Sequence, residues 1–576
     1  MTRGFDRAFT KNMNRRPLEN TIAFLLCTTI IVFFCTEIIL NLTPPISRDA
    51  LIHHLAVPKL WLKHGRIYEI PWANYAYYPM NIDLLYVVCL YFKNDIVPKF
   101  IHLAFGLGTG LLIYLYLKFR FGRTWGLLGV VIFITTPIVV WLSTTAYVDL
   151  GMTFFTTGSV MAFIKWRDSE YSQFKWLLIS SFYMGIALGS KYNALIAWFI
   201  MSMFLMLSVV RDTHRQTAAL QYGVLFFVVT AFVASPWYLK NYFQTGNPFY
   251  PLFNSLIDSF HHHSVQEALQ QRVTEKTGHF SFFKMREVMY GENFWETLLI
   301  PIRMFFQGKD NSYQYFQGCM NPILIVFSPF IILNKRYVKD KFIFVFFTVI
   351  FIIMAYFLTA KQVRYILPVL PFLAIIAVMG IKDLLDKMGV GETVGASFRS
   401  WKMIQSIIKV VVFTIVAILL TYNLLYLKQR INIIKPLPYI LEKESRDDFL
   451  RRHLLHYGAV QYINKTLPDD AVVFTMFLGR RGYYLNRNYK NESSFGMNTI
   501  RQMVISSANE ETFNNYVRST NVTHILVRSD LFYRLIHDNF SKAEIKRLLS
   551  LIHKRWTKVY ENKGYAVWDI HARDQL

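Results

Sequence analysis

Two aspartates stand where long apolar segments of the sequence end. Asp49 follows an apolar run and the pair Pro44-Pro45, and Asp149 follows a second run over 124–142. Proline stops a helix, and the helix dipole stabilises an aspartate as a carboxylate in the first turn of the next helix. Such a carboxylate can take a proton from a hydroxyl group or bind a cation. We expect the two acids to converge on one cavity, although position alone also fits two unrelated helix-capping groups.

Three basic residues lie near segment ends as well. Lys191 interrupts a stretch over 176–209 that is otherwise apolar. One helix of that length would reach about 51 Å, longer than the roughly 30 Å apolar core of a membrane, so Gly189-Ser190-Lys191-Tyr192-Asn193 predicts a turn. Arg364 precedes another apolar segment, and Lys240 follows one. These cations could bind a phosphate group, although for Lys191 simple snorkelling to the membrane interface is an equal alternative.

Histidines next to Asp49 raise the question of a metal. His53 and His54 could ligate one together with Asp49. Adjacent side chains on an α-helix point about 100° apart, so we expect at most one of them to face the same site. The tract His261-His262-His263 has no carboxylate at a useful spacing. The sequence leaves open whether a divalent metal is a cofactor, and it does not identify the ligands of such a metal. No P-loop, dinucleotide fingerprint or HExxH sequence is present.

The composition places these residues in a membrane protein. Of the 576 residues, 53% are hydrophobic and only 17% are charged, against roughly 25% charged in soluble chains. This excludes a soluble enzyme and a disordered protein. The formal net charge of +25 would suggest nucleic acid in a soluble chain. Here the basic residues lie in short loops, where they set topology and contact anionic lipid, so we expect membrane lipids and no nucleic acid as partners.

The apolar runs predict a polytopic α-helical protein with about eleven membrane spans. The basic loops fall on one side if the N-terminus is cytoplasmic, which puts the C-terminus outside. The transmembrane domain then covers 1–430, with outer loops at 42–97 and 237–320. The tail over 431–576 is charged and predicts a small extracytoplasmic α/β domain. Its short runs typical of strands are Ala471–Phe477, His524–Arg528 and Tyr565–Ile570. The predicted spans are 18–41, 98–118, 124–142, 149–166, 175–189, 192–210, 219–236, 322–333, 342–359, 365–381 and 403–427.

The sequence motifs resemble those of GT-C membrane glycosyltransferases. The similarity is to a bacterial branch related to protein O-mannosyltransferases and the aminoarabinose transferase of lipid A, and it extends over roughly residues 18–430. The segment after Asp49 looks like the first outer loop of that group, except that His53-His54-Leu55 replaces the Tyr-His-Leu of many relatives. The other similar motifs are Gly189–Asn193, Pro236–Asn241 with Thr245–Pro248, and Arg364–Pro368.

The resemblance implies a function and roles for individual residues. It implies transfer of a sugar, with inversion, from a polyprenyl-phosphate donor to an acceptor hydroxyl on a glycan, lipid or protein outside the membrane. Asp49 would be the general base and Asp149 a second acid that orients the acceptor or a cation. Lys191 and Arg364 would hold the lipid phosphate, with Lys240 a weaker candidate. Further residues expected to line the site are Arg48, His53, His54 and Tyr365.

Two other functions stay open on sequence. A ligase or polymerase of the same fold, using a diphosphate-linked oligosaccharide, would show the same motifs. A sugar-lipid flippase or transporter would typically show inverted repeats and ionisable groups in mid-membrane. The acids here stand at span ends and a large outer domain follows, which favours an enzyme. The family resemblance also suggests the bacterial inner membrane as the location.

Overall fold

The structure is a computed structural model that describes residues 2–254, 282–359, 361–389, 398–492 and 497–571. Its contacts divide the chain into two compact units. The first, called the helical unit, comprises Met1–Asn41, Pro79–Ile82 and Lys99–Lys435. The second, called the sheet unit, comprises Leu42–Tyr78, Asp83–Pro98 and Pro436–Leu576.

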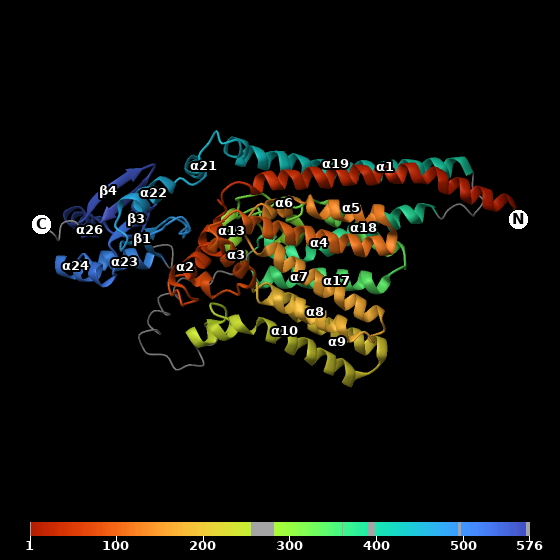
Figure 1. The fold of residues 1–576 in the computed structure, drawn as a ribbon, viewed down its shortest axis with the longest axis horizontal. Helices are drawn as coiled ribbons and strands as arrows, with labels where there is room; N and C mark the ends of the chain where they lie inside the picture. The colour runs from red at the N-terminus through yellow and green to blue at the C-terminus, as the bar shows by residue number, and fades with distance from the viewer. Residues whose placement is uncertain (1, 255–281, 360, 390–397, 493–496, 572–576) are drawn as a thin grey trace. The chain divides into compact units, whose positions relative to one another are not determined.

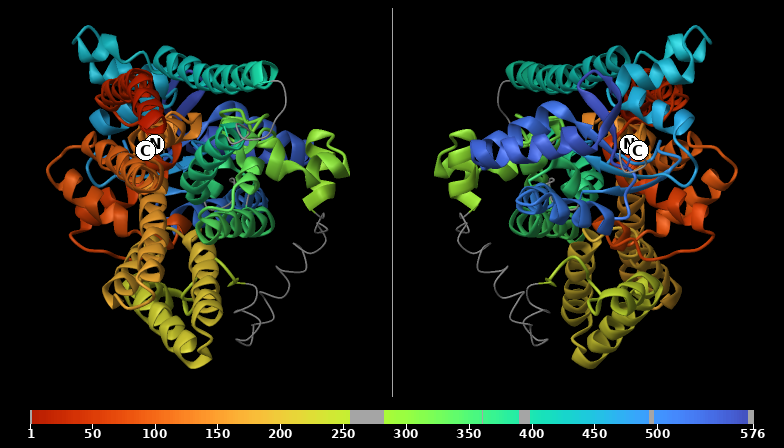
Figure 2. Two further views of the ribbon diagram at one scale, coloured as in Figure 1. Left: turned by 90° about the vertical axis from the view of Figure 1, so that its right-hand side faces the viewer. Right: turned by 90° about the vertical axis from the view of Figure 1, so that its left-hand side faces the viewer.

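The helical unit is a bundle of long apolar helices (Figure 1). Helix α18 packs against α5, α16 and α17, and α7 packs against α8. Figure 2 shows the bundle from two further sides. The elements are α1 (Thr2–Asn41), α4 (Val97–Phe121), α5 (Arg123–Ile134), α6 (Pro137–Ser143), α7 (Asp149–Asp168), α8 (Phe174–Leu188), α9 (Ala194–Thr213), α10 (Gln216–Thr245), α13 (Phe282–Tyr290), α14 (Phe294–Leu298), α15 (Ile300–Arg303), α16 (Ile323–Val326), η3 (Ser328–Leu333), α17 (Val338–Leu358), η4 (Val363–Val369), α18 (Leu370–Gly389) and α19 (Phe398–Ile434).

All eleven predicted spans lie on helices, but fewer helices are long and apolar enough to cross a membrane. Among the described residues seven helices meet that condition, or eight if α5 and α6, bent by 71°, form one span. Helix α8 and the segment Ile323–Leu333 are apolar but short. Helix α7 has 20 residues, and buried threonines such as Thr153 and Thr157 make it more polar. The polytopic helical fold is confirmed, with this smaller number of full-length spans.

Three loops with basic residues meet in the helical unit. Arg120, in the last turn of α4, forms ion pairs with Asp168 at 2.8 Å and with Asp340 at 3.0 Å. Arg167, at the end of α7, also pairs with Asp340. The sequence prediction put these three loops on one side of the membrane by their charge. Their direct contact agrees with a shared side.

The sheet unit contains a five-stranded sheet in the order β2-β1-β3-β5-β4. Strand β1 (Val472–Met476) is parallel to β2 (Asn488–Asn491) and β3 (His524–Arg528). Strand β5 (Tyr565–Asp569) is antiparallel to β3 and to β4 (Thr557–Asn562). Its helices in the tail are α20 (Leu437–Ile440), α21 (Arg446–His453), α22 (Tyr457–Thr466), α23 (Met497–Ser506), α24 (Glu510–Ser519), α25 (Ser529–Asn539) and α26 (Lys542–Arg555).

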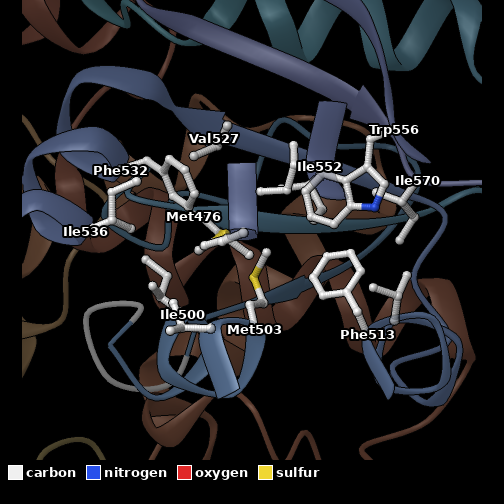
Figure 3. Packing of buried hydrophobic residues seen from close by; sticks show 14 of the residues in the cluster. Met476, Ile500, Met503, Phe513, Val527, Phe532, Ile536, Ile552, Trp556 and Ile570 are labelled. Atoms are coloured by element: carbon white, nitrogen blue, oxygen red, sulfur yellow. The ribbon is translucent and has the colours of Figure 1, made fainter. Parts of the chain in front are cut away.

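An apolar core holds the tail together (Figure 3). Met476 at the end of β1, Met503 on α23 and Trp556 after α26 belong to one buried cluster with Phe513 and Phe532. The parallel and antiparallel strands with covering helices confirm the predicted small α/β domain at the C-terminal end of the chain.

The first loop after α1 belongs to the sheet unit. We placed this loop, 42–97, with the transmembrane domain on sequence, whereas its contacts group most of it with the tail. The reason is a set of polar contacts across long sequence separations, such as the ion pair between Asp95 and Arg446. The loop contains η1 (Ala50–His54), α2 (Ala56–His64) and η2 (Asn74–Tyr77), and α3 (Asn81–Tyr91) follows them.

Candidate active site

The helical unit contains a buried ion pair between two of the predicted site residues. Asp149 is the first residue of α7 and is 0% exposed. Lys191 lies in the turn between α8 and α9, as the sequence predicted, and its Nζ donates to Asp149 Oδ1 at 2.6 Å. Because a buried carboxylate is costly without a partner, the ammonium group of Lys191 accounts for the burial of Asp149.

Arg364 and Tyr365 on η4 stand beside this pair. The Lys191 ammonium lies 5.5 Å from the centre of the Tyr365 ring. The Arg364 guanidinium lies 5.2 Å from the same ring and 5.8 Å from the ring of Tyr147, and its positive charge acts on the Asp149 carboxylate. The Nδ2 of Asn193 donates to the Tyr365 carbonyl at 3.4 Å. The structure therefore brings together Asp149, Lys191, Arg364 and Tyr365, which are far apart in the sequence.

Side chains from two other helices fix the turn that precedes Asp149. His102 on α4 is fully buried, and its Nδ1 lies 2.8 Å from the Leu142 carbonyl and 3.0 Å from that of Thr145. Its Nε2 accepts the backbone N–H of Leu150 at 2.9 Å. A ring whose Nε2 accepts keeps its proton on Nδ1, so His102 is in the neutral Nδ1–H form.

The first helix holds the same turn from its C-terminal end. Ser143 Oγ donates to the buried Glu37 carboxyl at 2.6 Å, and Asn41 Nδ2 donates to the Ser143 carbonyl at 2.9 Å. Glu37, Asn41 and His102 thus fix the backbone over 142–150 by side-chain hydrogen bonds. The position of Asp149 follows from this frame.

A second frame holds the turn with Lys191. The backbone N–H of Asn81 donates to the Gly189 carbonyl at 2.8 Å, and its side-chain Oδ1 accepts from Trp237 Nε1 at 2.7 Å. Any side chain at 189 would clash, since a Cβ there would lie 2.2 Å from Asn81 Nδ2. Tyr238 adds a bond to the Leu188 carbonyl at 3.3 Å. The sequence motifs around Lys191 and Trp237 therefore meet through Asn81.

Lys240 takes a different place from Lys191 and Arg364. It lies on α10, three residues after Trp237, and its ammonium group is 5.2 Å from the centre of that indole ring. It is half-buried. This contact places Lys240 beside Trp237, whose indole is part of the Asn81 frame.

The remaining predicted residues belong to the sheet unit. Asp49 is half-buried and immediately precedes η1, which is one turn of π-helix with the Leu55 N–H bonded to the Ala50 carbonyl at 2.9 Å. Arg48 is exposed. Single π-turns inside helical segments occur frequently at functional sites. Asp49 and Asp149 belong to different units.

The rings of both histidines after Asp49 lie in one cluster. The rings of His53 and His54 are 3.9 Å apart, and His53 stacks on Tyr75 at 4.8 Å. His54 Nδ1 lies 2.7 Å from Asp83 Oδ1, and both side chains are buried. That at most one of the two histidines faces the same site as Asp49 stays a prediction.

Metal ligands were considered in the same regions. Within the part of the chain that the structure describes, no group of three or more His, Cys, Asp or Glu side chains is arranged to hold a metal ion. The tract His261-His262-His263 lies outside the described residues.

Four positioning residues were not found from the sequence. Glu37 and His102 are single polar residues inside apolar runs, Asn81 follows a proline-methionine pair, and Asp83 lies in the first turn of the short helix α3. None forms a spaced motif. The available signal was the cost of an ionisable group in an apolar segment, which marks a residue with a specific partner.

Comparison with known proteins agrees with the resemblance seen in the motifs. The family model for dolichyl-phosphate-mannose-protein mannosyltransferase matches residues 74–257. The crystal structure of ArnT from Cupriavidus metallidurans bound to undecaprenyl phosphate superposes with a TM-score of 0.54 at 13% identity, over 95% of this chain and 98% of that one. The chain has the GT-C glycosyltransferase fold.

A second GT-C structure shares the architecture. The apo oligosaccharyltransferase of Archaeoglobus fulgidus superposes with a TM-score of 0.51 at 13% identity, over 95% of this chain and 75% of that one. The apo form of the Cupriavidus ArnT gives a TM-score of 0.52 over 96% of this chain. No curated protein sequence matches the chain significantly. At these identities the superpositions establish the GT-C fold, while substrate and acceptor require a separate argument.

Proposed function

We propose that this chain is an integral-membrane glycosyltransferase that moves a sugar from a polyprenyl-phosphate donor to an acceptor hydroxyl on the extracytoplasmic side. The main supporting observation is the juxtaposition of Lys191 and Arg364 at the N-terminus of α7. The family-model match and the undecaprenyl phosphate bound to ArnT, which has the same fold, support a lipid-phosphate donor.

The cations explain how the donor would be held and activated. Cleavage of the bond between the sugar C1 and the phosphate oxygen leaves negative charge on the phosphate. Lys191 and Arg364 would stabilise that charge in a water-poor setting, where fixed donors act most strongly. Asp149 fixes the ammonium group of Lys191, and the rings of Tyr147 and Tyr365 fix the guanidinium of Arg364. Lys240 would interact with the lipid phosphate less directly.

Asp49 would act as the general base. As the acceptor oxygen forms its bond to C1, its proton would pass to the Asp49 carboxylate, an effect worth roughly 10²–10⁴-fold. A single displacement of this kind inverts the configuration at C1. The position of Asp49 directly before a π-turn, with His54 fixed by Asp83, supports a role for this loop in chemistry.

Location and acceptor follow from the same proposal. The arrangement of basic loops supports a cytoplasmic N-terminus and an extracytoplasmic tail, and the family resemblance supports a bacterial inner membrane with a periplasmic tail. The acceptor would be a hydroxyl of a glycan, lipid or protein.

The test is transfer by the reconstituted full-length chain. Lipid-linked sugars that accumulate in cells lacking the protein, identified by mass spectrometry, would be supplied in proteoliposomes. Asp49→Asn and Asp49→Ala should abolish transfer with insertion and folding intact. Glu69→Gln, an exposed acid in the same loop, is the matched control and should keep full activity. Full transfer by Asp49→Asn would refute the base assignment, and lipid translocation without bond formation would refute the enzyme.

A further inference from the structure

A short segment of the tail, Tyr483–Asn486, is hydrogen-bonded to the loop that contains Asp49. The Tyr484 hydroxyl donates to the Pro45 carbonyl at 2.7 Å, and the backbone N–H of Tyr483 donates to the Leu51 carbonyl at 3.2 Å. These two acceptors flank Asp49, four residues before it and two residues after it. Both contacts lie inside the sheet unit.

Two lysines of α2 add further hydrogen bonds between this loop and the tail. Lys59 Nζ donates to the carbonyls of Tyr483 at 2.7 Å and Leu485 at 2.9 Å, and to Asn486 Oδ1 at 2.9 Å. Three acceptors use all three protons of an ammonium group. Lys63 Nζ adds bonds to the Asn486 carbonyl at 3.2 Å and to Asn488 Oδ1 at 2.8 Å.

The segment Tyr483–Asn486 is itself fixed by contacts with other residues of the sheet unit. It lies between β1 and β2, and Asn464 on α22 bonds to the Tyr484 carbonyl at 2.9 Å. The Tyr484 ring packs edge-on against Tyr457 at 5.6 Å. The Tyr483 hydroxyl donates to Asp95, which also pairs with Arg446. Burial raises the pKa values of the Tyr483 and Tyr484 hydroxyls well above 10, so both remain donors at physiological pH.

The backbone at the start of η1 determines where the Asp49 side chain lies. Asp49 is the N-cap residue of this turn. Its side chain projects from the backbone over 45–51, so a shift of that backbone moves the carboxylate. The tail bonds to that backbone on both sides of Asp49.

We infer that Tyr484 and Tyr483, anchored by Lys59, are positioning residues for Asp49, and that the tail domain is thereby part of the machinery for the chemical step. This inference rests on the proposed function, in which Asp49 is the general base. It gives the tail a role beyond covering the site or binding partners.

Tyr484→Phe tests the inference because it removes only the hydroxyl that reaches Pro45. We expect kcat to fall about tenfold, the effect of losing about 1.4 kcal/mol of alignment, with KM for the lipid donor unchanged. Hydrogen exchange of the peptide covering residues 46–55, measured in the full-length chain, should become faster. Tyr533→Phe is the matched control, since it removes the hydroxyl of an exposed tail tyrosine on α25 and should change neither quantity.

Three results would overturn the inference. They are an unchanged kcat in Tyr484→Phe, an unchanged exchange rate over 46–55, and a rise in KM with kcat preserved. Lys59→Met, which removes the anchor, should change kcat and exchange in the same direction as Tyr484→Phe. The base assignment is tested separately by Asp49→Asn. If that variant keeps full transfer, the proposed function fails. It fails even if faster hydrogen exchange over 46–55 in Tyr484→Phe shows that the tail holds the loop in place.

Discussion

The ammonium group of Lys191 and the carboxylate of Asp149 form a buried ion pair, 2.6 Å apart, between a turn and the start of a neighbouring helix. The sequence suggested each of them separately as a group for binding an anion or a cation. Their pairing means that each fixes the other, so an incoming phosphate would meet a lysine whose direction is already set. Preorganised charges of this kind avoid reorganisation at the moment of reaction.

The pair predicts a specific pattern of stability and activity. Lys191→Met leaves a buried carboxylate without its cation and should cost about 3 kcal/mol of unfolding free energy. Adding Asp149→Asn removes the unpaired carboxylate charge and should restore much of the lost stability. Both the single and the double variant should lack transfer activity. Thermal unfolding in detergent and a transfer assay would measure the two effects. Equal destabilisation of the single and double variants would contradict the pairing.

His102 should affect the reaction through the turn before Asp149. His102→Ala removes a donor to two carbonyls and the acceptor for Leu150 N–H, and leaving buried polar groups unpaired costs about 1–3 kcal/mol each. We expect a loss of stability and a loss of kcat of about tenfold or more. His102→Asn keeps a donor near the Nδ1 position and should be milder in both respects. If the alanine and asparagine variants are equally active, the histidine is not fixing this turn.

Much of the fold could be predicted from sequence because apolar runs and β-branched runs give strong signals. Strands β1, β3 and β5 were visible in this way. Strands β2 and β4 were missed, since they are the two edge strands and are largely polar, with sequences Asn-Tyr-Lys-Asn and Thr-Lys-Val-Tyr-Glu-Asn. An edge strand has one neighbour and more exposure, so its sequence needs no apolar alternation.

The sequence predicted the charged residues of the candidate site but not the residues that hold them in place. Lys191 was noticed because it interrupts an otherwise apolar stretch, and Arg364 because it directly precedes another apolar segment. Asn41 and His102 bond to backbone groups tens of residues away, which leave no trace in the sequence, and Glu37 accepts from the Ser143 hydroxyl, 106 residues away. The placement of the first loop with the tail was missed for the same reason, since Lys59 and Tyr484 also bond to carbonyls.

The close approach of Gly189 and Asn81 gives a further prediction. Gly189→Ala would place a Cβ 2.2 Å from Asn81 Nδ2, so either the Asn81 side chain, which accepts from Trp237, or the turn with Lys191 must shift. A misplacement of about 1 Å near the chemistry can cost about 100-fold in rate, and we expect a loss of that order in kcat. Combining the change with Asn81→Ser shortens the opposing side chain and should recover part of the rate. A fully active Gly189→Ala enzyme would show that the turn tolerates movement.

The tail should lose stability in mild acid because of His456. This side chain is buried, and desolvation together with the charge of Arg481 lowers its pKa from 6.5 to about 4. Between these values the unfolded state binds more protons than the native state, so stability falls as the pH drops from about 6.5 to about 4. The total loss below pH 4 should be about 3 kcal/mol. Limited proteolysis of the full-length chain during heating at pH 7 and pH 4.5 would follow the unfolding of the tail. His456→Gln cannot take up the proton and should reduce the shift in midpoint. An identical acid shift in this variant and the native chain would assign the sensitivity to other groups.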